Sequence, residues 1–579
     1  MRRLSLFAIG LLVLSLSLAS AQPAIRTDNG VLNASSYQAD LARGSWFVIF
    51  GTNMGPANIS IYSGAVPFPT SISGTSVTLT PAAGGSAITC RLWYTLATQI
   101  AALLPSTVTA GDYDVKVTYN NVTSAAYRVK VVERNFGYAT ASQNGAGVPQ
   151  ATNASLNGGV SLVRFTSGSI SFGGHDWPYR PAYPGETLIL WGTGLGADSQ
   201  SDENGGSSGD QTAAGGVKVI VGGLEITPAY AGRSSGSPGL DQINFTLPAS
   251  VPLGCGTTIQ VLAGGRYSNL GTLPTAKSGD QICQHPFLTQ TQLQTLDGGG
   301  EVIVGAFNLS KGTTSISFSG QSFDSSSESA GGSFSKYTAD KLTSVGGISV
   351  AQIGSCYVAR MRGTTTDALQ GPVIKAADAG TPLLLNGPNA SNKQLPRGTD
   401  NSYGVALYSS GIGGFGGSGS PTLAGGTYTL SGTGGTEIGG FSAQSPFPNA
   451  FDWTNRAGIG TITRGQALPI QWTGGGTEAG ATVNMVGMSG SQVGGTDQDP
   501  IYDIGMFVCT AAASAGSFTV PGSVTNYLSP VTAGSTTAIG LLSVSAFNTK
   551  AFTAPVVAGG NAPGQFSYDW TYSKTVAVQ

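Results

Sequence analysis

The chain has 579 residues, 87 of them glycine and 29 proline, with only 10% charged residues and a net charge of -2. This length predicts three to five domains, and the near-neutral charge argues against a nucleic-acid-binding protein, which would need a basic surface. The glycine excess, with 40% hydrophobic residues in short runs, favours all-β modules joined by many turns.

The first 21 residues have the pattern of a signal peptide. Arg2 and Arg3 precede an apolar run over residues 4–18, and residues 19–21 read Ala-Ser-Ala, which matches an A-x-A cleavage site. We therefore expect the mature chain to begin at Gln22 and to be secreted or held at the cell surface. No later stretch is apolar enough to predict a transmembrane segment, and no cysteine stands at the cleavage point to carry a lipid.

A repeated strand pattern organises the first half of the chain. Residues 44–55 read Gly-Ser-Trp-Phe-Val-Ile-Phe-Gly-Thr-Asn-Met-Gly, and residues 185–196 read Gly-Glu-Thr-Leu-Ile-Leu-Trp-Gly-Thr-Gly-Leu-Gly. In each, a turn glycine starts an apolar run of strand length that ends in residues tolerating positive φ. The offset is 141 residues here (185 − 44) and 143 at two Gln-Ile strands (242 − 99). This predicts a duplicated sandwich, with Gly44 aligned on Gly185 and Gln99 on Gln242.

These motifs support a resemblance to a known family. The order Asn-Ala-Ser-Ser-Tyr, Gly-x6-Gly-Thr-Asn, Gln-Ile-x3-Leu-Pro and Pro-x-Gly-Cys resembles the Solibacter-type C-terminal domain, an IPT/TIG-like Ig-like module of exported bacterial proteins. The resemblance covers two copies between Asn33 and Pro286, and we place the modules at residues 26–134 and 138–286. It implies β-sandwiches and an extracellular setting, and it transfers no catalytic residue.

The second half has a different texture, with Gly-rich and Ser-rich stretches between strand-like runs. We expect a third β-sandwich over residues 290–445 and a fourth module over residues 450–579. The fourth resembles Ig-like modules near the ends of exported bacterial proteins and in Ser- and Thr-rich fungal wall glycoproteins. The predicted fold class is therefore all-β, a tandem array of Ig-like β-sandwich modules.

The five cysteines are read against an oxidising, extracellular setting. The resembling family has cysteines at places matching Cys255 and Cys283, so we predict a disulfide there, with a stabilisation of about 3 kcal/mol on the chain-entropy model. Cys90 shares a strand face with apolar residues, which predicts a buried free thiol. Cys356 and Cys509 fall in different predicted modules and would pair only if those modules pack closely.

The histidine content argues against hydrolase and zinc chemistry. His175 and His285 are the two histidines, both near predicted domain edges, and no Gly-x-Ser-x-Gly elbow is present. A zinc site would need more nitrogen or sulfur ligands. A carboxylate pair across a groove stays open, although most of the 29 acidic residues are expected on solvated loops.

Calcium is the metal that the loops suit best, because it prefers oxygen ligands. One polar loop carries the candidate ligands Asp198, Asp202, Glu203 and Asp210. A second candidate loop carries Asp497, Asp499 and Asp503. Neither loop matches the spacing of the EF-hand or of the nonapeptide repeat, and an ordinary solvated loop is the commoner role for such residues. No other cofactor is expected.

Three rings in a Pro-rich connector form the candidate binding surface of the first half. Trp177, Tyr179 and Tyr183 lie just before the second glycine strand. Rings on a stiff surface segment can stack on sugars or anchor a protein partner. Rings in such a place more often close the end of a sandwich core.

These observations predict a non-catalytic exported protein with a binding, adhesive or structural role at the cell surface or in the extracellular matrix. Its partner would be an extracellular polysaccharide or a surface protein. The alternative is a polysaccharide-binding or carbohydrate-active protein in which the third and fourth modules hold the glycan. A secreted protease is disfavoured by the two histidines.

Overall fold

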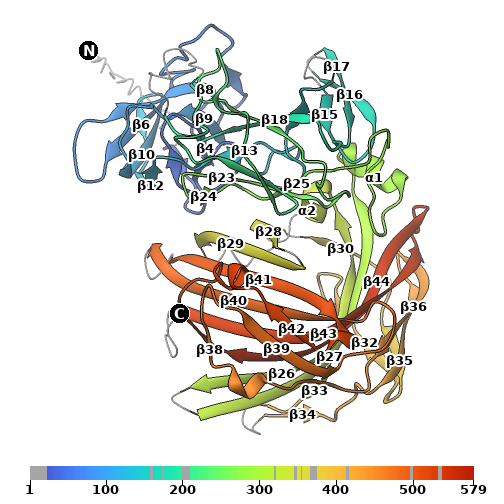
Figure 1. Cartoon of the computed structure of the whole chain (residues 1–579). Coiled ribbons are helices and arrows are strands. Elements are labelled where there is room, and N and C mark those ends of the chain that lie inside the picture. The colour runs from blue at the N-terminus through green and yellow to red at the C-terminus, as the bar shows by residue number, and fades with distance from the viewer. Residues whose placement is uncertain are drawn as a thin grey trace, which may run out of the picture.

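The computed structural model describes residues 22–156, 161–172, 174–197, 209–318, 321–343, 349–353, 355–364, 374–411, 416–495, 500–531 and 538–579. Strands dominate the described chain, so the predicted all-β fold class is confirmed. Two smaller β-bodies, blue to green in Figure 1, lie above a larger body that is yellow-green to red. The predicted signal peptide, residues 1–21, lies outside the described residues. No helix in the described part is long and apolar enough to cross a membrane.

The first body, the first sandwich, has the strand order of an Ig-like fold. One sheet orders β1 (Ala24–Ile25), β4 (Trp46–Thr52), β9 (Gln99–Leu103), β8 (Arg91–Thr95) and β5 (Ser60–Ile61), with β2 (Val31–Asn33) also on β4. The facing sheet orders β3 (Leu41–Ala42), β12 (Tyr127–Val132), β10 (Gly111–Tyr119), β6 (Thr75–Pro81) and β7 (Ile88–Thr89), with β11 (Val122–Thr123) on β10. β3 runs parallel to β12. This is the A-B-E-D order facing the G-F-C order of Ig-like sandwiches.

Side-chain alternation on β4 explains how this sandwich closes. Phe47 and Ile49 are fully buried between the sheets, where they join Val77, Val115 and other apolar residues in one core. Successive side chains of a strand point to opposite faces, so Trp46 and Phe50 lie on the outer face of the sheet. The outer face of β4 is thus aromatic, which matters for the site described below.

The second body, the second sandwich, repeats this strand order. One sheet runs through β13 (Gly137–Tyr138), β18 (Thr187–Thr193), β22 (Asp241–Thr246) and β21 (Tyr230–Arg233). The facing sheet contains β20 (Leu224–Ile226), β19 (Lys218–Val221), β23 (Thr258–Ala263), β24 (Arg266–Tyr267) and β25 (Gly271–Thr272). An insertion extends the first sheet beyond β18 with β14 (Ala151–Asn153), β15 (Ser161–Val163), β17 (His175–Arg180) and β16 (Gly168–Phe172).

The register confirms the duplication that the sequence predicts. Gly44 and Gly185 both adopt positive φ, 68° and 85°, and each lies two residues before the first residue of its strand, β4 or β18. Six residues after each glycine, Phe50 pairs with Gln99 in the first sandwich, and Trp191 pairs with Gln242 in the second. A register slip of one residue would turn every apolar side chain to the wrong face. The two copies have kept the same pairing because the buried face demands it.

The second half corrects the predicted domain boundary at residues 445–450. Among the described residues, one sheet orders β28 (Ser349–Ile353), β29 (Cys356–Thr364), β41 (Pro500–Ala512), β40 (Thr482–Gly495), β43 (Ala538–Pro555), β44 (Asn561–Thr575), β26 (Val302–Phe318), β27 (Gln321–Tyr337), β33 (Tyr403–Ser409) and β34 (Ser418–Gly419). β30 (Lys375–Ala377) pairs with β27. β26 pairs in parallel with β44, near the end of the chain. Residues 290–445 and 450–579 therefore form one third body, and their prediction as separate modules is wrong.

Smaller sheets pack on this large sheet. One orders β32 (Ala390–Leu395), β31 (Leu383–Gly387), β35 (Gly426–Gly434) and β36 (Gly439–Phe447), and another orders β37 (Phe451–Trp453), β39 (Leu468–Gly474) and β42 (Ser517–Val520). β38 (Thr461–Ile462) pairs with β45 (Ala577–Val578), and short helical turns lie at α2 (Ala339–Thr343), η3 (Arg456–Gly458), η4 (Ala513–Ala515) and α4 (Gly522–Thr525). Phe307 of the large sheet stacks on Phe441 of β36 with ring centroids 6.0 Å apart, and Phe334 meets Phe441 edge to face at 5.0 Å. Such aromatic pairs make this interface a shared core.

A short helix joins the second sandwich to the third body. α1 (Gln290–Asp297) begins with a capping box in which Thr289 and Gln292 satisfy each other's backbone N–H groups. Leu293 and Leu296 of this helix are buried in a small core beside the second sandwich. At its other end, the Asp297 carboxylate accepts hydrogen bonds from the backbone of the second sandwich, and burial raises the pKa of this carboxyl. The connection is a packed junction and not an open linker.

Candidate functional site

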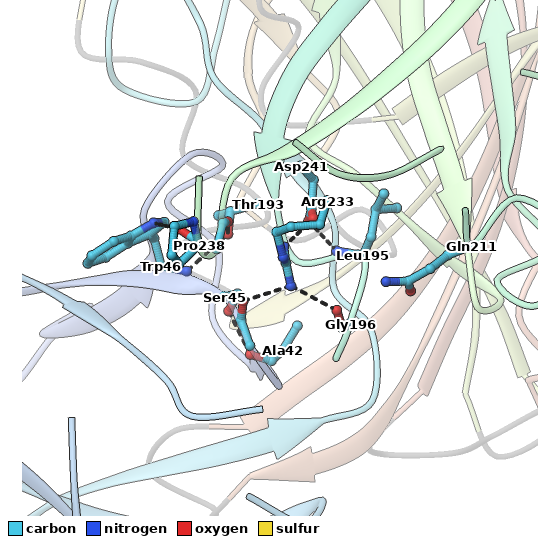
Figure 2. A network of polar contacts seen from close by, with 12 residues as sticks. Ala42, Ser45, Trp46, Thr193, Leu195, Gly196, Gln211, Arg233, Pro238 and Asp241 are labelled. Atoms are coloured by element: carbon cyan, nitrogen blue, oxygen red, sulfur yellow. Dashed lines mark hydrogen bonds and ion pairs between the residues drawn. The ribbon is translucent and has the colours of Figure 1, made fainter. Parts of the chain in front are cut away.

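The polar junction between the first and second sandwiches is built around Arg233, at the end of β21 (Figure 2). Its side chain is fully buried, as is that of its ion-pair partner Asp241. Its Nη1 pairs with Asp241 Oδ1, and its Nη2 donates to the carbonyl oxygens of Gly44 at 3.0 Å and Gly196 at 3.1 Å. Asp241 Oδ2 also accepts from the backbone N–H of Leu195 at 2.7 Å. One buried ion pair thus holds the start of one glycine strand against the end of the other.

Trp46 and Thr193 make a second set of contacts across the same junction (Figure 2). The backbone N–H of Trp46 donates to Thr193 Oγ1 at 2.9 Å, and Thr193 Oγ1 donates to the Gly239 carbonyl at 2.6 Å. The Trp46 indole N–H donates to the Pro238 carbonyl at 2.8 Å. The Gly-Thr of the second repeat is therefore both the end of a strand and a contact with the first sandwich.

Asparagine side chains add further hydrogen bonds across the junction. Asn33 Nδ2 donates to the carbonyl of Asn135 at 3.1 Å, and Asn135 Nδ2 donates to the carbonyl of Asp40 at 2.8 Å. At Gly194, whose φ is 108°, an added Cβ would lie 2.3 Å from the Asn135 carbonyl oxygen. Only glycine fits this approach. Charged and amide groups that are buried and paired in this way fix one arrangement of the two sandwiches.

Sequence reasoning missed Arg233 and Asp241, although a signal for them exists. Thr95 pairs with Ile100 in the first sandwich, and Ala231 pairs with Ile243 in the second. Counting from these pairs, the positions of Arg233 and Asp241 are occupied in the first copy by Ala97 and Thr98. The second copy therefore has a pair of opposite charges where the first copy has uncharged residues. Such a difference between aligned copies indicates a contact that only the second copy makes.

The structure confirms the predicted Cys255–Cys283 disulfide and the predicted free thiol of Cys90. Cys255 and Cys283 form a disulfide with their Cα atoms 5.0 Å apart. Cys356 and Cys509, whose pairing the sequence left open, form a second disulfide with a Cα separation of 3.9 Å. They lie opposite each other on β29 and β41, so the condition of close packing is met within one sheet. Cys90 is a free thiol buried in the first core.

The Cys90 thiol is expected to be unreactive until the first sandwich unfolds. Its side chain is fully buried, and burial raises the pKa of the thiol, which suppresses the nucleophilic thiolate. A thiol reagent such as dithionitrobenzoate should label no cysteine in the native protein over hours and Cys90 alone in denaturant without reductant. Rapid labelling of the native chain would contradict the burial of Cys90.

The predicted ring surface is only partly a surface. Trp177 and Tyr179 lie on β17, which pairs with β15 and β16, so the segment is a strand and not the connector that the prolines suggested. Both rings are half-buried. Tyr183 is 8% exposed, its hydroxyl donates to the Asp280 carbonyl at 2.6 Å, and the Arg180 guanidinium lies 3.8 Å from its ring centroid. Tyr183 therefore belongs to the sandwich, whereas binding by Trp177 and Tyr179 stays a prediction.

Replacing Tyr183 by alanine is expected to lower the free energy of unfolding by about 3–5 kcal/mol, the usual cost of deleting a buried ring. Tyr183→Phe keeps the ring and loses the hydrogen bond, so about 1 kcal/mol is expected. Urea unfolding would measure both, with Trp177→Ala as the half-buried comparison. Equal small losses for Tyr183→Ala and Trp177→Ala would show that Tyr183 is not a core residue.

The calcium prediction is untested by this structure. Asp198, Asp202 and Glu203 lie outside the described residues, as do Asp497 and Asp499. Asp210 is exposed and caps a turn, where its Oδ1 accepts from the N–H of Thr212 at 2.9 Å and from its hydroxyl at 2.6 Å; these hydrogen bonds lower the pKa of the Asp210 carboxyl. Asp503 accepts from the Ser529 hydroxyl at 3.3 Å. Within the described ranges, no group of three or more His, Cys, Asp or Glu residues could hold a metal ion.

The histidines have local roles. His285 Nδ1 accepts a hydrogen bond from the backbone N–H of Leu288 at 3.2 Å, and its partial burial lowers the pKa of the imidazole. A neutral imidazole is the form that accepts at this nitrogen. His175 is exposed at the start of β17. His285 therefore has a structural role, since it accepts a backbone hydrogen bond in the turn that follows the second sandwich.

A row of rings, which we call the aromatic face, covers the outer side of the first sandwich. It comprises Trp46, Tyr62, Phe68, Trp93 and Tyr94, and it continues along β4 to the pair Tyr37 and Phe50. Neighbouring ring centroids are 5.1–6.2 Å apart. Trp93 is 47% exposed, and three apolar residues on or near β5, which pairs with β8, are exposed too: Ile59, Ile61 and Val66. Such a gathering of exposed apolar side chains is typical of an interaction surface.

Two hollows accompany these surfaces. One of about 370 Å³ lies at the end of the aromatic face, between β1 and β4, and is lined by Ile25, Arg26, Phe50 and Thr98 among others. The larger, about 670 Å³, is an open groove between β36 and the end of β43 in the third body. Its lining is mostly polar and includes Thr427, Ser442, Gln444, Glu478, Lys550 and Phe552.

Comparisons with known proteins show no family for this chain. No protein-family model matches it, and no curated protein does. Among solved structures, domains 5–6 of the S-layer protein SbsC are 12% identical over 44% of this chain and 100% of that chain, with a TM-score of 0.15. Titin domains I67–I69 are 7% identical over 69% and 95%, with a TM-score of 0.10, and the N-terminal four Ig domains of Dscam1 isoform 7.44 are 8% identical over 93% and 96%, also at 0.10.

TM-scores this low carry no argument about this chain. The Ig-like assignment of the first and second sandwiches therefore rests on their own strand order, A-B-E-D facing G-F-C. The narrower resemblance to the Solibacter-type domain, drawn from motif order, stays a prediction.

Proposed function

We propose that this chain is an exported, non-catalytic protein of the cell surface or extracellular matrix, with a structural and adhesive role. One observation carries this proposal: its β-bodies are joined by buried contacts, above all the Arg233–Asp241 pair bound to the Gly44 carbonyl. Domains joined by small polar interfaces move relative to each other by default. A buried, hydrogen-bonded ion pair opposes that motion and suits a protein that spans a distance and transmits force.

Other features support the same role. The disulfides Cys255–Cys283 and Cys356–Cys509 fit an oxidising exterior. The packed helix α1 extends the stiff connection to the third body. The predicted signal peptide supplies the export route, and the aromatic face supplies a surface for attachment.

The test is the location and rebinding of the protein. Antibody detection in fractionated producing cells should place the chain in the envelope or matrix fraction, and purified mature chain should rebind to matrix from cells that lack it. Recovery in the cytoplasm, or in the medium without any rebinding, would contradict the proposal. Matrix binding should be unaffected by Cys90→Ala, which serves as the control.

The groove of the third body favours a second candidate function, polysaccharide binding by that body. Its volume of about 670 Å³ falls in the range of ligand sites, and amide, hydroxyl and charged side chains are the groups that bind sugar hydroxyls. A glycan array probed with the mature chain would test this. We expect hits that Gln444→Ala weakens, since Gln444 lines the groove and is exposed. An array without hits, or hits that Gln444→Ala leaves unchanged, would contradict it.

A further inference from the structure

We propose that the aromatic face of the first sandwich, with the Arg26 hollow at its end, binds an acidic polysaccharide. This inference rests on the adhesive role proposed above and names its ligand class. The ligand is an extended chain of sugars that carry carboxylates. The site comes from the described residues of β1, β4, β5, β8 and β9 and the loop before β6.

The first step is the accessibility of the rings. Trp93, the most exposed ring of the face, lies 6.0 Å from Trp46 and 5.8 Å from Tyr94 between ring centroids. Trp46 continues the row to Phe68 at 5.1 Å. The row lies on the outer side of the sheet whose inner side holds the core residues Phe47 and Ile49. Tyr62 also packs against the first core, whereas Trp46, Phe68, Trp93 and Tyr94 are not part of it. Aromatic faces of this kind stack on the apolar faces of sugar rings.

The second step is charge. Between Asp40 and Asp112 the chain has no acidic side chain, and β4, β5, β8 and β9 all fall in this span. The span contains Arg43, which pairs with Glu133 outside it at 2.8 Å, and Arg91, which lies on β8. A sheet face with arginine and no carboxylate of its own is complementary to an anionic ligand and not to a cationic one.

The third step is the position of Arg26. Its guanidinium lies 5.1 Å from the Phe50 ring centroid and donates to the carbonyls of Asp28 at 2.6 Å and Asn29 at 2.9 Å. These contacts hold an exposed cation over a ring at the edge of the 370 Å³ hollow. A planar guanidinium presents several donors to a carboxylate while its face stays on the ring. Asp28 is the acidic residue nearest to it along the chain, and it lies outside the hollow's lining.

Gln99 and Tyr94, which lie between the Trp93 end of the face and Arg26, can bind sugar hydroxyls. Gln99 Nε2 donates to the Tyr94 hydroxyl at 2.8 Å, and both side chains are half-buried on the outer face. The pair keeps the phenol and amide available to sugar hydroxyls between the Trp93 and Phe50 ends of the face. Apolar stacking, hydroxyl contacts and one carboxylate contact together describe an acidic sugar chain.

Binding of the mature chain to polygalacturonate, with dextran as the neutral probe, tests the inference by isothermal titration at low salt. We expect binding to polygalacturonate, at least tenfold weaker binding for Trp93→Ala, and weaker binding with a smaller salt dependence for Arg26→Gln. Tyr357→Ala, which removes a ring 44% exposed on the third body, is the matched control and should bind as the unmodified chain does. Thermal unfolding should show all three variants folded.

Three results would overturn the inference. They are no binding to polygalacturonate, binding that survives both Trp93→Ala and Arg26→Gln, and equal binding to dextran. A Trp93-dependent dimer in sedimentation without polysaccharide binding would assign the face to a second copy instead. Matrix rebinding by the Trp93→Ala variant at full strength would leave the adhesive role standing while removing this site, so the two proposals fail separately.

Discussion

Replacing Arg233 by methionine is expected to lower the free energy of unfolding by about 3–5 kcal/mol, the usual cost of breaking a buried ion pair from one side. Methionine has a similar length but no charge, so the Asp241 carboxylate would stay buried without the opposite charge, while the Leu195 N–H still donates to it. The carbonyls of Gly44 and Gly196 would lose a donor at the same time. Urea unfolding of the mature chain measures this loss.

Comparison with a surface pair isolates the effect of burial. Arg128 pairs with Asp114 at 2.7 Å, with the two side chains 59% and 29% exposed, so Arg128→Met should cost less than about 1 kcal/mol. The double variant Arg233→Met/Asp241→Leu removes both charges and should recover much of the stability. A loss for Arg233→Met as small as that for Arg128→Met would show that the ion pair does not hold the junction.

Local signals predicted local structure well. Gly44 and Gly185 were identifiable because only a few residue types tolerate positive φ, and the apolar run after each glycine has strand length. The Gln99 and Gln242 strands followed because equal spacing in two copies implies equal pairing. The fold class and the duplication depended on this kind of evidence alone.

Contacts between residues far apart in the sequence could not be predicted from these local patterns. Arg233 donates to the carbonyl of Gly44, 189 positions away, and nothing in the residues around either position names the other. The parallel pairing of β26 with β44 had no local sign for the same reason, and two predicted modules merged into one body. Contacts of this kind depend on the whole fold.

Tyr183 shows why a binding surface is hard to recognise from sequence alone. Trp177, Tyr179 and Tyr183 stand close together in sequence, yet strand pairing and the bond to Asp280 place Tyr183 in the sandwich. The rings around Trp93 come from strands and loops far apart in sequence and meet only in the folded sheet. The sequence offered one local signal for this face: an aromatic residue that alternates with the buried residues of its strand, such as Trp46 next to buried Phe47, points to the outer side of the sheet.

Removing the Cys356–Cys509 disulfide is expected to have the larger effect of the two disulfides. It closes a loop with a sequence separation of 153, against 28 for Cys255–Cys283. On the chain-entropy model, its loss raises the free energy of the folded state relative to the unfolded one by about 5 kcal/mol, about 1.5 kcal/mol more than loss of the shorter loop. All four sulfurs belong to buried residues, so alanine replacement leaves a comparable gap in each pair.

The comparison requires two double variants, Cys356→Ala/Cys509→Ala and Cys255→Ala/Cys283→Ala, unfolded in urea beside the unmodified chain. The first should lose more, and its loss should appear in the transition of the third body, because β29 and β41 are neighbours within the large sheet. The second should affect the second sandwich and α1, whose buried leucines pack in the same small core as Cys255 and Cys283. If loss of the Cys255–Cys283 disulfide proved the more destabilising, native-state packing around Cys255 would outweigh chain entropy, and the prediction would be wrong.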